Sequence, residues 1–85
     1  MKPCAWFLGE EAAESFLRLT RRQKLVVLDL LRHLAQFPHL DPDRFVRTGR
    51  RDLIREKTFG RWQIAWWVDE PVDEIHVLSI RRLGR

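Results

Sequence analysis

The sequence predicts an α+β domain in which a two-helix hairpin packs on one face of a mainly antiparallel sheet. Two patterns carry this prediction. Apolar residues at helical spacing fill much of the first half of the chain, and strand-like alternation fills much of the second half. Because a chain of 85 residues is too short to supply two separate cores, residues 1–85 are expected to form a single domain with one core.

The first half begins with a short strand and a short helix. The apolar run 5–8 predicts the strand, which ends at Gly9. Glu10 and Glu11 follow, and acidic residues in a first turn complement the positive end of a helix dipole. The apolar residues after them recur at helical spacing, so residues 10–17 are expected to be helical.

A second helix is predicted between Thr20 and Pro38. Thr20 and Gln23 have the spacing of a capping box, in which each side chain satisfies a backbone amide of the other residue. An apolar stripe then follows at positions 27, 30, 31 and 34, which places these side chains on one helical face. Proline cannot continue a helix, so Pro38 ends it.

Three strands are predicted in the second half, over residues 53–57, 62–68 and 75–80, with turns at 59–61 and 69–73. Together they form an antiparallel meander. Side chains alternate between the two faces of a strand, so Trp62 and Trp66 are expected in the core under the helices. Trp67 has the opposite parity.

Positive charge is concentrated in the second half. Residues 1–43 carry six basic and six acidic side chains, whereas residues 44–85 carry ten and six. Such a cluster favours a phosphate backbone or an acidic protein partner, and the alternative is an ordinary solvated surface.

Several other classes of site are not indicated. Cys4, His33, His39 and His76 have no metal-ligand spacing, so neither a metal nor another cofactor is expected. The single cysteine allows no internal disulfide. The sequence has no signal-peptide pattern and no stretch long enough to span a membrane, so a cytoplasmic protein without a membrane partner is expected.

The candidate site is a group of basic side chains with aromatic neighbours. Guanidinium groups can hold a phosphate and stabilise charge that develops on it, and an indole can stack a base. The candidates for catalysis are Arg55, Lys57, Arg61 and Arg81, with Glu56 and His76 for proton transfer. The candidates for nucleic-acid binding are Arg47, Arg50, Arg51, Gln63, Trp67 and Arg82. We expect these groups to converge on the sheet surface that the helices leave uncovered.

Residues 53–82, LIREKTFGRWQIAWWVDEPVDEIHVLSIRR, resemble the C-terminal half of RelE/ParE toxins. Members of that superfamily tend to have a leucine-arginine strand, a Gly-Arg-aromatic strand and a last strand that ends in a basic pair. The resemblance implies the α+β fold above and a cognate antitoxin. It matches Arg55 and Lys57 to the basic residues of the first of these strands, Arg61 to the Gly-Arg-aromatic element, and Arg81 and Arg82 to the final pair.

The resemblance implies one of two activities. RelE-like members cut messenger RNA on the ribosome, often with a terminal Tyr or His, and ParE-like members inhibit DNA gyrase without that catalytic set. Here Gln63 replaces a frequent arginine, and the sequence contains no Tyr. These two departures count in favour of a ParE-like inhibitor, but on the resemblance as a whole we expect a RelE-like, metal-independent endoribonuclease. A ParE-like gyrase inhibitor and a non-toxic basic RNA-binding module remain as alternatives.

Overall fold

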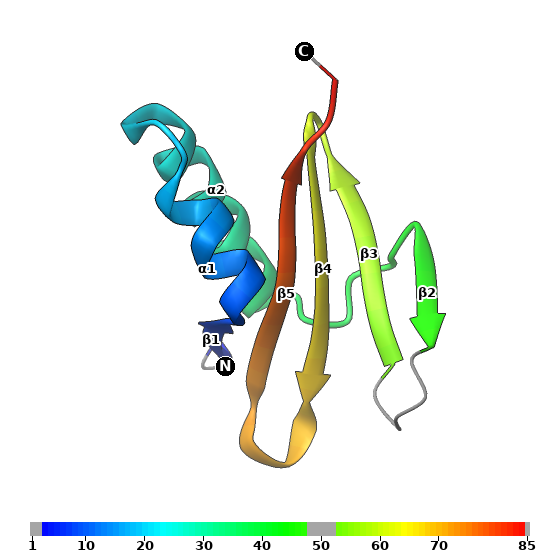
Figure 1. Cartoon of the computed structure of the whole chain (residues 1–85). Coiled ribbons are helices and arrows are strands. Elements are labelled where there is room, and N and C mark those ends of the chain that lie inside the picture. Colours follow the sequence, from blue (N-terminus) through cyan, green and yellow to red (C-terminus); the bar gives the residue numbers. More distant parts are fainter. Residues whose placement is uncertain (1–2, 48–52, 85) are drawn as a thin grey trace.

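The computed structural model describes residues 3–47 and 53–84 (Figure 1). Within these ranges the chain forms an α+β fold, as predicted. In order, the elements are β1 (Ala5–Leu8), α1 (Glu10–Leu17), α2 (Arg21–Gln36), β2 (Arg44–Arg47), β3 (Leu53–Phe59), β4 (Trp62–Asp69), a 3-10 turn (Glu70–Val72) and β5 (Glu74–Arg82).

The sheet has five strands in the order β1-β5-β4-β3-β2. The three C-terminal strands form the predicted antiparallel meander, and β1 joins it parallel to β5. Sequence reasoning missed β2, which pairs antiparallel with β3 at the edge of the sheet. Two of its four residues are arginines, and charged side chains are common on exposed edge strands because they discourage pairing with another chain.

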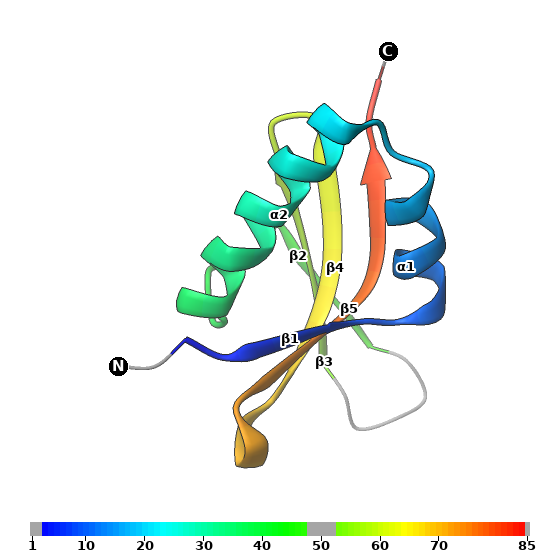
Figure 2. The same ribbon diagram turned by 90° about the vertical axis from the view of Figure 1, so that its left-hand side faces the viewer.

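The two helices begin differently. The capping box predicted for α2 is present: the Gln23 amide donates to Thr20 Oγ1 over 3.2 Å, and the Thr20 amide donates to Gln23 Oε1 over 3.0 Å. No side chain caps α1, which follows Gly9 and has Glu10 and Glu11 in its first turn. Figure 2 shows α2 lying across one face of the sheet and α1 lying alongside β5.

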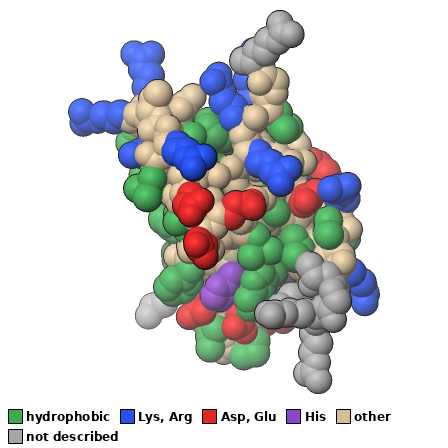
Figure 3. All heavy atoms as spheres, in the orientation of Figure 1, with side chains coloured by type: hydrophobic (Ala, Val, Ile, Leu, Met, Phe, Trp, Pro, Cys, Tyr) green, Lys and Arg blue, Asp and Glu red, His purple; other side chains and the backbone are tan. Residues whose placement is uncertain are grey.

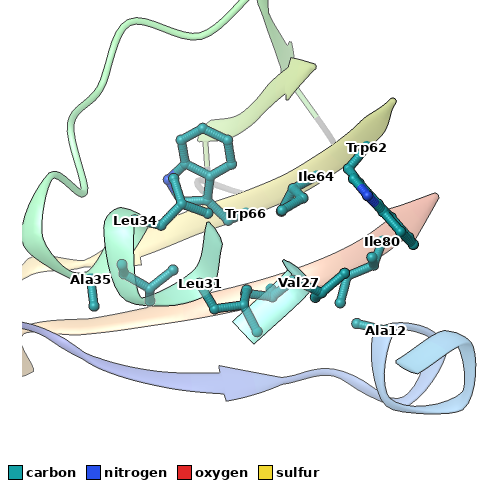
Figure 4. Packing of buried hydrophobic residues seen from close by; sticks show 11 residues of the cluster. Ala12, Val27, Leu31, Leu34, Ala35, Trp62, Ile64, Trp66 and Ile80 are labelled. Carbon is teal, nitrogen blue, oxygen red and sulfur yellow. The ribbon is translucent and has the colours of Figure 1, made fainter. Parts of the chain in front are cut away.

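The core lies between α2 and the central strands. Val27, Leu31 and Leu34 of α2 are fully buried and belong to the same cluster as Ile64 and Trp66 of β4 (Figure 4). The spacing of these α2 residues puts them on one side of the helix, as the sequence predicts. The expectation for the tryptophans is also confirmed, because both Trp62 and Trp66 are buried.

A bulge divides the last strand. Ala65 pairs with Ser79 and Trp66 pairs with Val77, so Leu78 has no partner on β4. Beyond such an extra residue the alternation of side chains between the two faces is reversed. As a result, the core side chains of β5 do not follow a single parity: Ile75 and Val77 precede the bulge, and Ile80 follows it.

Candidate nucleic-acid interface

The strand register decides which face each candidate side chain occupies. The covered face is the one that carries Ile64 and Trp66 under α2, and the open face is the opposite one. Directly paired residues share a face. Arg55 pairs with Trp66, and Lys57 pairs with Ile64, so both cations lie on the covered face. The expectation that all the candidate cations converge on the open face is therefore wrong.

Arg55 and Lys57 are half-buried and have partners of their own. The Arg55 guanidinium lies 5.0 Å from the centre of the Phe45 ring on β2. The Lys57 ammonium lies 3.7 Å from an Asp43 carboxylate oxygen and 5.9 Å from the centre of the Phe59 ring. Arg47 pairs with Leu53 at the exposed end of β2. All three cations therefore lie on the β2–β3 side of the sheet. Arg50 and Arg51 lie outside the described residues.

The two candidates for proton transfer lie on the open face but apart from each other. Glu56 is on β3 and His76 is on β5, with β4 between them, which separates their backbones by about 10 Å across the sheet. Glu56 accepts a hydrogen bond of 2.5 Å from Arg44 Nε, which raises the pKa of that guanidinium. The His76 ring stacks on Trp67, with ring centres 4.4 Å apart. The two side chains are therefore held by different partners on different strands.

Cys4 offers no alternative nucleophile. Partial burial, with a smaller contribution from the charge of Asp73, raises the pKa of its thiol above the ordinary value. A raised pKa keeps the thiol protonated near neutral pH, and the thiolate is the nucleophilic form.

A different group of arginines does come together, where the β3–β4 turn meets the end of β5. Gly60 adopts a φ of 61°, and the two-residue turn Gly60-Arg61 joins β3 to β4. The Leu83 amide donates to the Arg61 carbonyl over 2.6 Å, which ties the end of β5 to this turn. Arg82 pairs with Trp62 on the covered face, and Arg81 pairs with Gln63 on the open face. Both arginines are exposed.

The first turn of α2 completes this group and forms a pocket of about 450 Å³ with it. We call it the arginine pocket, and it is lined by Arg22, Gln23, Val26, Phe59, Gly60, Arg61, Trp62 and Arg82. Three arginines thus line the same pocket as several apolar and aromatic side chains. The arrangement suits a phosphate group with an attached ring, because the arginines supply charge and the aromatic walls supply apolar contact.

Sequence reasoning missed Arg22. A signal was present, since Arg21 and Arg22 occupy the first turn of α2, which contains no acidic residue. Cations near a helix N-terminus oppose the helix dipole, at a cost of roughly 0.3–1 kcal/mol each. Residues kept at an unfavourable position are candidates for a functional role.

Charge is therefore divided between the two ends of the β4–β5 hairpin. The arginine pocket and Arg81 lie at one end, and Asp69, Glu70, Asp73 and Glu74 lie at the other. In Figure 3 most Lys and Arg side chains lie in the upper half of the view, whereas a histidine lies lower, among hydrophobic and acidic side chains. A polyanion is expected to approach the basic end.

Comparison with known proteins shows which solved structures share the fold of this chain. No protein-family model and no curated protein matches the chain. The RelBE2 toxin–antitoxin complex from Mycobacterium tuberculosis contains a similar chain, with a TM-score of 0.75, 14% identity, and coverage of 94% of this chain and 98% of that one. The isolated E. coli RelE toxin is also similar, with a TM-score of 0.67, 12% identity, and coverage of 96% and 86%.

The chain has a RelE-like toxin fold. A chain of the intact E. coli RelBE toxin–antitoxin complex agrees, with a TM-score of 0.73, 13% identity, and coverage of 96% of this chain and 99% of that one. The fold predicted from the resemblance of residues 53–82 is thus confirmed over nearly the whole chain. Among the described residues, no helix is long and apolar enough to cross a membrane.

Proposed function

We propose that this RelE-like protein is the toxin of a toxin–antitoxin pair and cuts messenger RNA on the ribosome. The arginine pocket is the observation that carries the proposal. Arg22, Arg61 and Arg82 line one pocket together with Phe59 and Trp62. Guanidinium groups in this arrangement can hold the phosphate and stabilise the charge that develops on it when a neighbouring 2′-hydroxyl attacks.

The lining of the pocket supports the proposed dependence on the ribosome. None of its eight lining residues is a His, Asp, Glu or Lys, so the pocket itself supplies no usual general acid or base. Attack by a 2′-hydroxyl needs a proton acceptor, and departure of the leaving oxygen needs a proton donor. We infer that bound RNA, water or ribosomal groups supply these functions, and that the protein contributes charge and positioning. Free RNA should then be a poor substrate.

Two solved neighbours of this chain are described as toxin–antitoxin complexes. By analogy we propose a cognate antitoxin with an acidic amphipathic segment. Such a segment would neutralise the exposed arginines at the basic end and compete with RNA for it.

The proposal is tested by inducible expression in bacteria, scored for growth and for the integrity of messages on the same samples. The unsubstituted protein should arrest growth and leave cleaved messages. Arg22→Ala, Arg61→Ala and Arg82→Ala should each reduce cleavage, by about 100-fold where the arginine stabilises the transition state. Arg32→Ala is the matched control, because Arg32 lies on the same helix as Arg22 but pairs with Asp29 away from the pocket.

One observation favours the alternative, a ParE-like inhibitor of DNA gyrase. Glu56 and His76 lie on separate strands, and neither lines the arginine pocket. An inhibitor needs no proton-transfer groups. Growth arrest with intact messages and altered plasmid supercoiling would support this activity and exclude the nuclease. Normal growth after verified expression would leave a non-toxic RNA-binding module.

A further inference from the structure

A second group of side chains, each of which can ligate a metal ion, lies at the other end of the β4–β5 hairpin from the arginine pocket. Asp69 is the last residue of β4 and Glu74 is the first of β5, and the two are direct cross-strand partners. His76 follows two residues later, on the same face of β5. One potential ligand atom from each side chain lies within 4.8 Å of the other two.

This cluster is partly sheltered and held in place. All three residues are half-buried on the open face. The His76 ring lies between two aromatic rings, with its centre 4.4 Å from that of Trp67 and 5.7 Å from that of Phe7. His76 Nε2 is 3.2 Å from Glu74 Oε1. Stacking therefore holds the imidazole plane, and Nε2 points toward the Glu74 carboxylate.

The charges of the cluster favour a cation. Two carboxylates face each other directly across the strands, and like charges at such positions repel. Among the described residues, the basic group in contact with this pair is the imidazole of His76, which is charged only when protonated. A divalent ion held by all three side chains would replace that proton and offset both negative charges.

We propose that Asp69, Glu74 and His76 form a binding site for a divalent transition-metal ion, of which Zn²⁺ is the best match. Zinc takes imidazole nitrogen and carboxylate oxygen together, often with three protein ligands and one water. Magnesium and calcium prefer oxygen ligands alone. Tetrahedral zinc places its ligand atoms roughly 3.3 Å apart. Side-chain rotations that move the carboxylate oxygens by about 1 Å would bring the three ligand atoms to this spacing.

The histidine and cysteine spacing in the sequence predicted no metal site, because two of the three ligands are carboxylates brought in by strand pairing. The site is also separate from the proposed RNA contact. Asp69 and Trp62 stand at opposite ends of β4, about 23 Å apart along the strand. Substitutions in the arginine pocket should therefore leave metal binding unchanged.

The test is titration of tag-free protein with Zn²⁺ by calorimetry, and with Co²⁺ by absorption and by tryptophan fluorescence. One ion should bind per chain, Mg²⁺ should not compete, and Co²⁺ should quench the emission of Trp67, whose ring stacks on His76. His76→Gln and Asp69→Asn should each weaken Zn²⁺ binding by at least about tenfold. Asp69→Asn keeps the stacked rings, so it remains decisive if His76→Gln loosens the fold.

Three controls locate the ion. Glu70→Gln removes a neighbouring acid whose carboxylate contacts His39, and His33→Gln and Cys4→Ser remove ligand types elsewhere in the chain. All three should bind Zn²⁺ like the unsubstituted protein. The proposal is overturned by the absence of one-to-one binding, and equally by binding that survives both His76→Gln and Asp69→Asn.

Discussion

Trp66 links two parts of the fold through a single side chain. Its ring is fully buried against α2, and its Nε1–H donates a hydrogen bond of 3.1 Å to the carbonyl of Pro38. The proline that ends the helical segment thus also accepts the polar edge of the largest core side chain. A buried indole is stabilising when its N–H has such a partner.

We predict that Trp66→Phe lowers the free energy of unfolding by about 1–3 kcal/mol, because the Pro38 carbonyl loses its donor. Trp66→Ala should cost about 3–5 kcal/mol, since it also leaves a cavity. Urea unfolding followed by circular dichroism measures both. Trp67→Phe is the control, because it retains a ring at the stacked, half-buried position. Equal losses for Trp66→Phe and Trp67→Phe would contradict this role for the hydrogen bond.

The tryptophans also mark how far single residues could be predicted. Strand alternation placed Trp62 and Trp66 correctly, because the spacing of apolar residues along a strand indicates which of its faces is buried. The stacking of His76 between Phe7 and Trp67 was not predictable. It brings together strands that begin and end the chain, and such pairing has no local signal in the sequence.

Elements whose ends are marked by capping or helix-terminating residues were predicted well. The boundaries of α2 follow from the capping box at Thr20 and from Pro38, whose effects act within a few residues. The short strand β2 has no comparable signal. Its four residues, RFVR, do not alternate in polarity and are too few to form a recognisable pattern, and their partner is defined only by the register with β3.

The capping box yields a prediction at the level of this helix. Thr20→Ala removes the acceptor for the Gln23 amide and should lower the free energy of unfolding by about 1 kcal/mol. Thr20→Ser keeps a hydroxyl acceptor and should be close to unchanged. Thermal and urea unfolding measure both variants. If the alanine and serine variants were equally stable, the cap would contribute nothing to the protein.

Sheet register explains why the candidate site was only partly predicted. The expectation of one basic open face assumed that cations on neighbouring strands share a parity. Instead, Arg55 and Lys57 fall on the covered face, and the bulge beside Leu78 shifts the parity of the strand that ends in Arg81 and Arg82. A shift of one residue moves a side chain to the opposite face, and nothing in the sequence of β5 marks the position of this bulge.

At the scale of the whole molecule, charge runs from a basic end to an acidic end of the same hairpin. Arg61 and Arg82 lie with Arg22 at one end, and Asp69 and Glu74 lie at the other. The net charge of +4 does not reveal this division. The proposed functions use it: RNA would meet the basic end, and a metal ion would neutralise the acidic end.

The central claim is that the arginine pocket is where RNA binds. The most direct measurement is the affinity of a short single-stranded RNA for the unsubstituted protein and for Arg82→Ala, over a range of salt concentrations. Arg82→Ala should bind RNA more weakly. The slope of its plot of log affinity against log salt concentration should be smaller in magnitude by about one, which corresponds to one fewer counterion released. Arg32→Ala should match the unsubstituted protein at every salt concentration. If instead Arg82→Ala retains full affinity and slope, the pocket does not contact RNA.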